Sequence, residues 1–307
     1  MAVGGADAPG TIDPAMNTTT AEPLNAWYET SARELPWREP GTTGWGVLVS
    51  ETMLQQTPVR RVEPVWWEWM RRWPRPSDLA AASQAEVLRA WGKLGYPRRA
   101  LRLHQAAEAI AAEHDDVVPS DVDTLLGLPG IGTYTARAVA AFAYGRRAPV
   151  VDTNVRRVVA RAVHGAGDAG PPSPNRDLAD VEALLPDDDA KAAKLSAAIM
   201  ELGQTVCTAR APGCDLCPIA HDCAWLAAGC PEYAGPPKKV QRFAGTDRQV
   251  RGKLLDVLRG ASGPVERADL DRAWSEAGQR DRCLDSLLVD GLVEQTEDGR
   301  FALPGEH

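Results

Sequence analysis

Two carboxylates in this sequence could take part in acid–base chemistry. Glu51 lies in the apolar helical stretch 45–57, where a carboxylate either faces solvent or is held in a site, because an unpaired buried charge is costly. Desolvation in such a site would raise the pKa of Glu51 towards the range of a general acid. Asp152 follows the apolar pair Val150-Val151 and opens a helical pattern, so a reactive role competes with that of an ordinary N-cap.

Four cysteines form a compact array, with the spacing Cys207-x6-Cys214-x2-Cys217-x5-Cys223. Thiolates this close together in the chain can bind one metal ion or an iron–sulfur cluster, and the spacing alone does not separate zinc from iron–sulfur. Six cysteines in 307 residues are too few for a secreted disulfide scaffold. The array therefore predicts a metal site in a reducing compartment.

A glycine-rich hairpin, Leu128-Pro129-Gly130-Ile131-Gly132, separates the helical patterns 122–127 and 135–144. Two glycines at this spacing allow a tight turn whose N–H groups point outward at the start of a helix. Such a turn can accept an anion, and DNA phosphate is the natural candidate. A plain turn remains the alternative, but the sequence helix–LPGIG–helix has the form of a helix–hairpin–helix phosphate clamp.

The elements that must position these residues are helical. From Asn25 to about Ala228, apolar residues recur at intervals of three and four, as in 78–90, 99–113 and 190–202, and prolines separate the segments. We expect an all-α body, preceded by a disordered leader at 1–23 and followed by a linker at 231–245. Residues 246–307 predict three helices, at 250–258, 270–274 and 283–288, and a hairpin turning at Asp298-Gly299. This pattern suggests a winged-helix-like module, with a small helical cap as the alternative.

Charge permits nucleic-acid binding without establishing it. The net charge is −8, but 60–102 holds ten basic residues against four acids, whereas 246–307 holds nine against 13. No apolar run is long enough to span a membrane, and no export signal opens the chain. We therefore expect an intracellular, cytoplasmic protein that binds no membrane and acts as a monomer.

Together these motifs resemble the helix–hairpin–helix, iron–sulfur DNA glycosylases, and within them the adenine glycosylases of the MutY type. The matching pieces follow in family order from about residue 24 to 228: LPWR (35–38), SETMLQQT (50–57), WGKLGYPRRALRLH (91–104), LPGIGTYTA (128–136), VDTNVRRV (151–158), MELG (200–203) and the cysteine array. The resemblance implies a six-helix barrel at 46–153, with the hairpin motif at about 121–146. It also implies an iron–sulfur helical domain formed by 24–45 and 154–230, with a [4Fe-4S] cluster on Cys207, Cys214, Cys217 and Cys223.

The resemblance also assigns roles to individual residues. Glu51 would protonate the adenine ring at N7 and then activate water, and Asp152 would stabilise the oxocarbenium-like sugar. Tyr134 would orient Asp152 or the sugar, with Asn154 and Glu201 as helpers. The expected DNA and base contacts are Arg33, Leu35, Trp37, Gln55, Gln56, Thr57, Leu94, Tyr96, Leu128, Gly130 and Gly132, among which Gln56 and Tyr96 would enter the stack beside the partner base.

The expected substrate is double-stranded DNA with adenine opposite 8-oxoguanine or guanine. Two alternatives remain: an endonuclease III-like glycosylase and AP lyase for oxidised pyrimidines, and a non-catalytic DNA-binding regulator. The lyase branch carries a catalytic lysine where this chain has Tyr134, and a phenol cannot form the Schiff base that an amine forms. We therefore expect a monofunctional enzyme. Family members usually carry a longer C-terminal domain that reads the 8-oxoguanine strand, so the shorter module here leaves the partner-base preference open.

Overall fold

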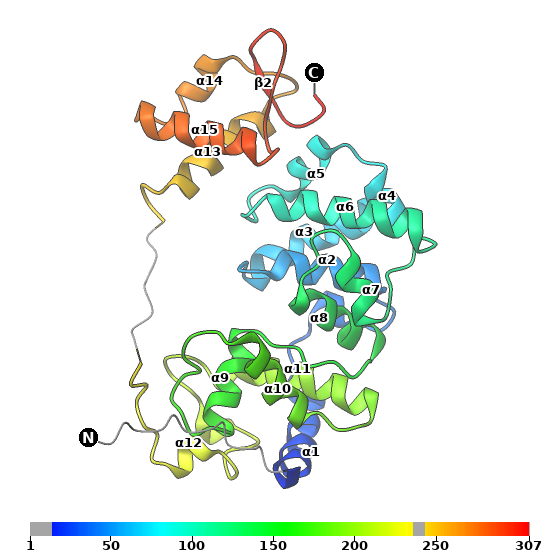
Figure 1. The fold of residues 1–307 in the computed structure, drawn as a ribbon, viewed down its shortest axis with the longest axis vertical. Coiled ribbons are helices and arrows are strands. Elements are labelled where there is room, and N and C mark those ends of the chain that lie inside the picture. Colours follow the sequence, from blue (N-terminus) through cyan, green and yellow to red (C-terminus); the bar gives the residue numbers. More distant parts are fainter. Residues whose placement is uncertain (1–13, 236–242, 307) are drawn as a thin grey trace, which may run out of the picture. The chain divides into compact units, whose positions relative to one another are not determined.

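The computed structural model describes residues 14–235 and 243–306, with side chains from residue 21 onward, and it divides the chain into two compact units. Of the described residues, unit 1 takes 14–39, 120–122 and 136–235, and unit 2 takes 40–119, 123–135 and 243–306. Apart from one two-stranded hairpin, the regular elements of these residues are helices (Figure 1), so the predicted all-α class is confirmed. None of the described helices is long and apolar enough to cross a membrane.

Unit 1 is built from helices that pack around one apolar core. Leu24, Val159 and Ile199 are buried in it, together with Leu195 and Ile219. The helix α1 packs against α11 and α10, and α9 packs against α11 and α12. The elements of unit 1 are α1 (Pro14–Ser31), η1 (Pro36–Arg38), α9 (Thr153–Ala162), α10 (Pro174–Leu184), α11 (Asp189–Thr205), η2 (Cys214–Leu216) and α12 (Ala224–Ala227).

The helix α1 corrects the predicted leader. It begins at Pro14, a residue type favoured at the first helical position, and so includes the second half of the segment 1–23 that the sequence analysis predicted to be disordered. Ala21 and Leu24 are buried against α10 and α11, and this apolar contact stabilises a helix that local composition does not favour. Residues 1–13 of the predicted leader lie outside the described residues.

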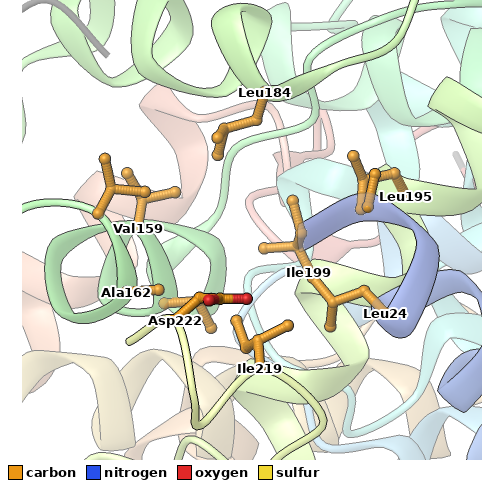
Figure 2. A pocket seen from close by; sticks show the side chains of 11 residues that line it. Leu24, Val159, Ala162, Leu184, Leu195, Ile199, Ile219 and Asp222 are labelled. Carbon is orange, nitrogen blue, oxygen red and sulfur yellow. The ribbon is translucent and has the colours of Figure 1, made fainter. Parts of the chain in front are cut away.

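An apolar cavity lies in the core of unit 1, lined by side chains from α1, α9, α10 and α11 and from the cysteine loop (Figure 2). Leu24, Leu195, Ile199 and Ile219 surround it, and Asp222 is the one charged side chain of the lining. Because no set of polar groups converges there, the cavity is a packing feature of the core rather than a candidate site. It does place Ile219, from the segment between Cys217 and Cys223, inside the core.

Unit 2 contains the helices of the predicted barrel and the C-terminal module. The predicted helix 78–90 is two helices in the structure, because Ser83 caps a new one: its hydroxyl accepts from the N–H of Glu86, whose carboxylate accepts from the N–H of Ser83. The barrel helices are α2 (Gly44–Leu54), α3 (Val59–Arg72), α4 (Pro76–Ala80), α5 (Gln84–Trp91) and α6 (Arg98–Glu113). The hairpin motif joins α7 (Val122–Gly127) to α8 (Thr133–Tyr144); only the first turn of α8 belongs to unit 2, and its residues from 136 onward belong to unit 1.

The C-terminal module has the three helices and the hairpin that the sequence predicts. Its elements are α13 (Asp247–Gly260), α14 (Arg267–Asp271), α15 (Ala277–Val289), β1 (Glu294–Gln295) and β2 (Phe301–Ala302), drawn in orange and red in Figure 1. The turn falls where Asp298-Gly299 predicts it, with Gly299 at φ 86° and the N–H of Thr296 donating to the carbonyl of Arg300 at 2.9 Å. The predicted helix at 270–274 is wrong in its bounds, because a capping box between Glu266 and Asp269 starts α14 earlier.

The compact units differ from the predicted domains in two respects. Residues 136–153 belong to unit 1 and not to the barrel, and one contact that holds them there is the hydrogen bond from the Ser196 hydroxyl of α11 to the carbonyl of Ala148, at 3.1 Å. The module at 246–307 belongs to the same unit as the barrel, because α13 packs against α5. Most of the predicted linker, 236–242, lies outside the described residues.

Candidate active site

Glu51 lies on α2, a helix that is buried over almost its whole length. The side chain of Thr43 caps the helix, and Glu51 itself is only 5% exposed. The hydroxyl of Tyr134, in the first turn of α8, donates a hydrogen bond of 2.8 Å to Oε2 of Glu51. This contact, between residues 83 apart in the chain, gives Tyr134 a partner that the sequence analysis did not name.

A second hydrogen bond ties the same two helices together. Nε2 of Gln55 donates to Oγ1 of Thr135 at 3.1 Å, one helical turn after Glu51. Both α8 residues follow the hairpin glycines directly, so the hairpin motif positions the buried carboxylate through two side-chain contacts. The hydrogen bond from Tyr134 holds one oxygen of the Glu51 carboxyl group in a fixed position, as a group that exchanges a proton requires.

The predicted partner-base residues gather in two adjoining loops of unit 2. Oγ1 of Thr57 donates to the carbonyl of Leu94 at 3.1 Å and so joins the loop after α2 to the loop before α6. Gln56 and Tyr96 both have positive φ angles, 57° and 47°, a backbone region that side chains other than glycine rarely occupy. Strained residues held at a surface are typical of functional positions, since the surrounding structure must enforce them.

Arg99 joins the two loops that contain these residues, and the sequence analysis did not single it out. Its Nη1 donates to the carbonyls of Thr52 and Gln55 at 2.6 and 2.7 Å, and its Nη2 donates to Oγ1 of Thr57 and the carbonyl of Gly95 at 3.1 and 3.0 Å. One guanidinium thereby joins the end of α2 to both loops. Burial lowers the pKa of Arg99 to about 10, which leaves the side chain charged at neutral pH.

The glycine hairpin presents an exposed tip on a buried base. Leu128 and Ile131 are 5% and 8% exposed, whereas Gly130 and Gly132 lie at the surface. Gly130 has φ 74°, and a Cβ there would lie 2.5 Å from Cβ of Arg102, so only glycine fits. Gly132 has open space around it. Leu128 therefore anchors the turn, and the predicted phosphate contact of the glycines stays a prediction.

Asp152, in unit 1, is the N-cap of α9. Its Oδ1 accepts from the N–H groups of Asn154 and Val155 at 2.8 and 2.7 Å, and its Oδ2 accepts from Nδ2 of Asn154 at 2.7 Å. Burial raises the pKa of Asp152 above its usual value, and these hydrogen bonds offset part of that rise. The cap is formed, and it does not exclude the reactive role, because the cap bonds hold the carboxylate in one orientation.

A chain of contacts runs from Asp152 to the cysteine loop. Nη2 of Arg157 donates to Oδ1 of Asn154 at 2.9 Å, and its Nε donates to the carbonyl of Cys207 at 2.7 Å. Gly203 of the MELG motif permits this arrangement, since a Cβ there would lie 2.8 Å from the carbonyl oxygen of Asn154. The sequence analysis named neither Arg157 nor Gly203, although both lie in its motifs.

The four predicted ligand cysteines are free, partly buried thiols in one loop of unit 1. Burial, together with the smaller effect of the neighbouring thiols of Cys207, Cys223 and Cys214, raises the pKa of Cys217 to about 11. Nη1 of Arg161 lies 3.4 Å from Sγ of Cys207 and supplies positive charge beside the loop. As they stand, no three His, Cys, Asp or Glu side chains of the described residues are gathered closely enough to hold a single metal ion.

Glu201 is fully buried in α11 and forms a double ion pair. Oε1 accepts from Nε of Arg33 at 2.5 Å, and Oε2 accepts from Nη2 of Arg38 at 2.9 Å. The two ion pairs hold the segment that contains η1 against α11. Leu35 and Trp37 of this segment are 7% and 5% exposed. The contacts of Arg33 and Glu201 within unit 1 are thus structural, while their predicted roles in base binding and catalysis stay predictions.

The structure thus brings the predicted residues together in separate groups. Glu51, Gln55 and Tyr134 form one group in unit 2, next to the Thr57–Leu94 contact. Asp152 and Asn154 form another in unit 1, as do Arg33 and Glu201. Because Glu51 and Asp152 belong to different units, and each unit is described by itself, their joint action belongs to the proposal below.

Comparison with known proteins decides the family. A model of the HhH-GPD superfamily base excision DNA repair proteins matches residues 49–178. The adenine DNA glycosylase of Mycolicibacterium smegmatis is 67% identical over 285 residues, which cover 92% of this chain and 95% of the relative. That of Mycobacterium tuberculosis is 64% identical over 284 residues, covering 92% of this chain and 93% of the relative. The chain belongs to the adenine DNA glycosylases.

The fold agrees with this membership. Endonuclease III, solved as a trapped covalent complex with DNA, has a TM-score of 0.60 with this adenine glycosylase at 20% identity, covering 72% of this chain and 100% of its own. At that identity the likeness shows the fold alone, and the predicted helix–hairpin–helix glycosylase fold is confirmed. The protein is a base-excision-repair glycosylase that acts on adenine.

The C-terminal module is shared with the mycobacterial adenine glycosylases. The alignment to the M. smegmatis enzyme leaves only 8% of this chain uncovered, which is too little for the module at 246–307 to be absent from that relative. At least part of the module therefore has a counterpart in that relative.

Replacing Glu201 with Ala should destabilise this adenine glycosylase by about 3 kcal/mol, because it leaves two arginines without the buried carboxylate that neutralises them. Denaturant unfolding of the purified full-length protein measures the change. Glu34→Ala, which removes an exposed carboxylate in the same segment, should change the free energy of unfolding little. Equal stability of the two variants would contradict the structural role of the pair.

Proposed function

We propose that this adenine glycosylase hydrolyses the N-glycosidic bond of adenine opposite 8-oxoguanine or guanine in duplex DNA, as a monomer and without an efficient lyase step. The observation that carries the proposal is the buried Glu51, held by the hydroxyl of Tyr134 at the start of the hairpin-motif helix. A buried carboxyl group that a neighbouring hydroxyl orients is suited to deliver a proton. Double-stranded DNA is a substrate only of an enzyme with access to it, so an intracellular location is part of the proposal.

The chemistry follows from the two carboxylates. Glu51 donates its proton to N7 of the flipped adenine, and the C1′–N9 bond then breaks with its electron pair moving to the base. The anionic Asp152 stabilises the positive charge that develops on the sugar, as the second carboxylate of a glycosidase does. Glu51, now a carboxylate, takes a proton from the water that attacks C1′, so the enzyme returns to its initial state.

The partner base would be contacted by the two loops that Arg99 joins. Gln56 and Tyr96, which have positive φ, would enter the stack, and Thr57 and Leu94, which are hydrogen-bonded to each other in the same loops, would contact the partner base beside them. An aromatic ring suits this place because every base offers a π-face. Base flipping costs a few kcal/mol, and a rigid wedge lowers that cost by filling the vacated space.

The proposed absence of a lyase step rests on Tyr134. An amine must attack C1′ to form a Schiff base, and Tyr134 instead offers a phenol that donates to Glu51. We expect base release to leave an intact abasic site, with strand breaks forming only after alkali is added. Rapid cleavage without alkali, or efficient trapping of the enzyme on DNA by borohydride, would contradict this part.

The decisive experiment is single-turnover base release from duplexes with adenine opposite 8-oxoguanine, guanine, cytosine or thymine. The proposal expects release opposite the two purines at rates well above those opposite cytosine and thymine. Guanine, cytosine and thymine as target bases opposite the same partners serve as controls and should not be released. Equal adenine release from all four duplexes would refute the proposed partner preference.

We further propose a [4Fe-4S] cluster on Cys207, Cys214, Cys217 and Cys223. The donor set fits: four soft thiols share one loop without disulfides, and Arg157 and Arg161 supply positive charge and hold the loop to α9. When bound, the cluster would cross-link the loop and so fix the end of the contact chain that begins at Asp152.

Loss of the cluster should therefore destabilise the folded protein. Cys214→Ser is expected to lower the iron content per protein and the visible absorbance of the purified protein, and to lower the unfolding temperature. Cys230→Ser, at an exposed cysteine outside the array, is the matched control and should leave all three unchanged. Iron content unaffected by Cys214→Ser, or zinc in place of iron in the wild type, would contradict the assignment.

A further inference from the structure

The C-terminal module is joined to the barrel by specific contacts. Arg89 of α5 forms an ion pair with Glu306 and donates to the carbonyl of Ala261 at 2.9 Å, while Arg259 of α13 donates back to the carbonyl of Leu88 at 3.1 Å. The side chain of Arg259 is 12% exposed. This reciprocal exchange of arginines between helix ends fixes the module relative to α5.

Acids of the module neutralise further basic residues of the barrel. Asp290 accepts from Arg98 of the barrel at 3.1 Å and from Arg251 of the module at 2.6 Å, and Asp256 lies 3.5 Å from Nζ of Lys93. Asp256, Asp290 and Glu306 thus help to dock the module on the barrel, while other acids, such as Asp247, pair with arginines of the module itself.

Arg248, in the first turn of α13, differs from its neighbours. It is exposed and forms no ion pair with any described residue, whereas Arg251, Arg259 and Arg282 of the same module are all paired. Its guanidinium lies over the ring of Tyr96, 4.3 Å from the centroid, and 5.9 Å from the centroid of Phe243. Both rings are exposed, Tyr96 by 37% and Phe243 by 58%.

The ring of Tyr96 consequently has a guanidinium from each part of unit 2 beside it. Arg99 of the barrel lies 5.6 Å from its centroid, and Arg248 approaches it from the module. Two like charges at one exposed ring repel each other, and an anion placed there relieves that repulsion. A planar guanidinium also binds paired acceptors well, either two phosphate oxygens or O6 and N7 of guanine.

We propose that the C-terminal module binds the DNA strand opposite the target adenine, through Arg248 beside Tyr96. This inference rests on the proposed function in one point only, the place of Tyr96 next to the partner base. The module would thus help to hold the partner strand. The residue responsible is Arg248, which packs on Tyr96, the side chain proposed to enter the base stack. The contact is to a phosphate or to a guanine edge, which share the acceptor chemistry named above.

The test is equilibrium binding of the full-length protein to duplexes in which a stable abasic-site analogue stands opposite guanine, 8-oxoguanine or thymine. Arg248→Ala should weaken binding by about tenfold. If the contact is to a phosphate, the loss should affect every duplex and the salt dependence of binding should have a slope smaller by about one. If the contact is to a guanine edge, the loss should be selective for the duplexes with guanine or 8-oxoguanine. Arg272→Ala removes a charge that is paired with Asp269 in the same module, and should bind as the wild type does. Equal unfolding temperatures would show that both variants keep the module docked.

Wild-type affinity, salt slope and partner preference in Arg248→Ala would overturn the inference. Because the analogue has no base to release, the measurement does not depend on catalysis. If the protein released no adenine from any mispair while Arg248→Ala still weakened binding, the proposed function would fail and the inference would stand.

Discussion

Glu51→Gln should lower the single-turnover rate of adenine release by about 10²- to 10⁴-fold, the range that a positioned general acid–base contributes. Glutamine has nearly the same shape, and its amide can still accept the hydrogen bond from Tyr134, so the geometry of α2 should persist. The variant loses the proton that Glu51 would donate to the adenine, and it loses the carboxylate that would later act as general base towards water. DNA affinity should stay within about twofold, because a buried side chain that is 5% exposed contributes little to phosphate binding.

Quenched-flow or manual single-turnover assays with excess enzyme separate this effect from slow product release. Glu68→Gln makes the same chemical change at an exposed position of α3 and should keep the wild-type rate. Tyr134→Phe should give a smaller loss and a shifted pH profile, since it removes only the donor to Glu51. A wild-type rate in Glu51→Gln would exclude this residue as the acid.

The helices and the hairpin could be predicted because their signals are local. The bounds of 122–127 follow from periodicity, the turn at Gly299 follows from an Asp-Gly pair, and α6 differs from its predicted start by one residue. The errors arose where a tertiary contact or a cap outweighed the pattern. Apolar packing extends α1 to Pro14, and the Ser83 cap divides one long periodic segment into α4 and α5.

The types of the candidate site residues could be predicted, but their partners could not. Nothing in the sequence near Glu51 indicates Tyr134 as its donor, because the two lie 83 residues apart and meet only in the folded chain. Arg99 lies in a motif with several arginines, and its role emerges only from the carbonyls that converge on it. The same holds for Arg248, because only the docking of the module on the barrel brings its guanidinium over the ring of Tyr96.

Asp152 combines two roles that the sequence analysis treated as competitors. The cap bonds from Asn154 and Val155 fix the carboxylate, and α9 continues from there to the arginines that hold the cysteine loop. Burial nevertheless raises the pKa of Asp152, which means that the folded protein disfavours the charged form. The Asp152 side chain thus stabilises α9 through its cap bonds, whereas its buried charge destabilises the folded protein. Such a cost is expected where a charge is kept for catalysis.

Asp152→Asn separates the two roles. Asparagine is as good an N-cap as aspartate, so α9 should keep its start, while the negative charge opposite the developing sugar cation is lost. We expect the single-turnover rate of adenine release to fall by about 10²- to 10³-fold, as for other losses of electrostatic stabilisation. In the wild type the rate should also fall as the pH drops through the raised pKa of Asp152, because protonation removes the same charge.

Asp152→Asn should lower the rate of adenine release but should not lower the stability of the folded protein at pH 7. For an acid whose pKa is higher in the folded than in the unfolded state, stability is lost as the pH rises through the folded pKa, so at pH 7 the wild type bears the full cost of ionising Asp152. Asp152→Asn removes that cost and should unfold at the same or a higher denaturant concentration at pH 7, with the difference narrowing towards acid. Asp152→Ala, which also loses the cap, should be less stable than Asp152→Asn by about 1 kcal/mol. An asparagine variant that is both less stable than the wild type at pH 7 and fully active would show that the carboxylate serves α9 and not the reaction.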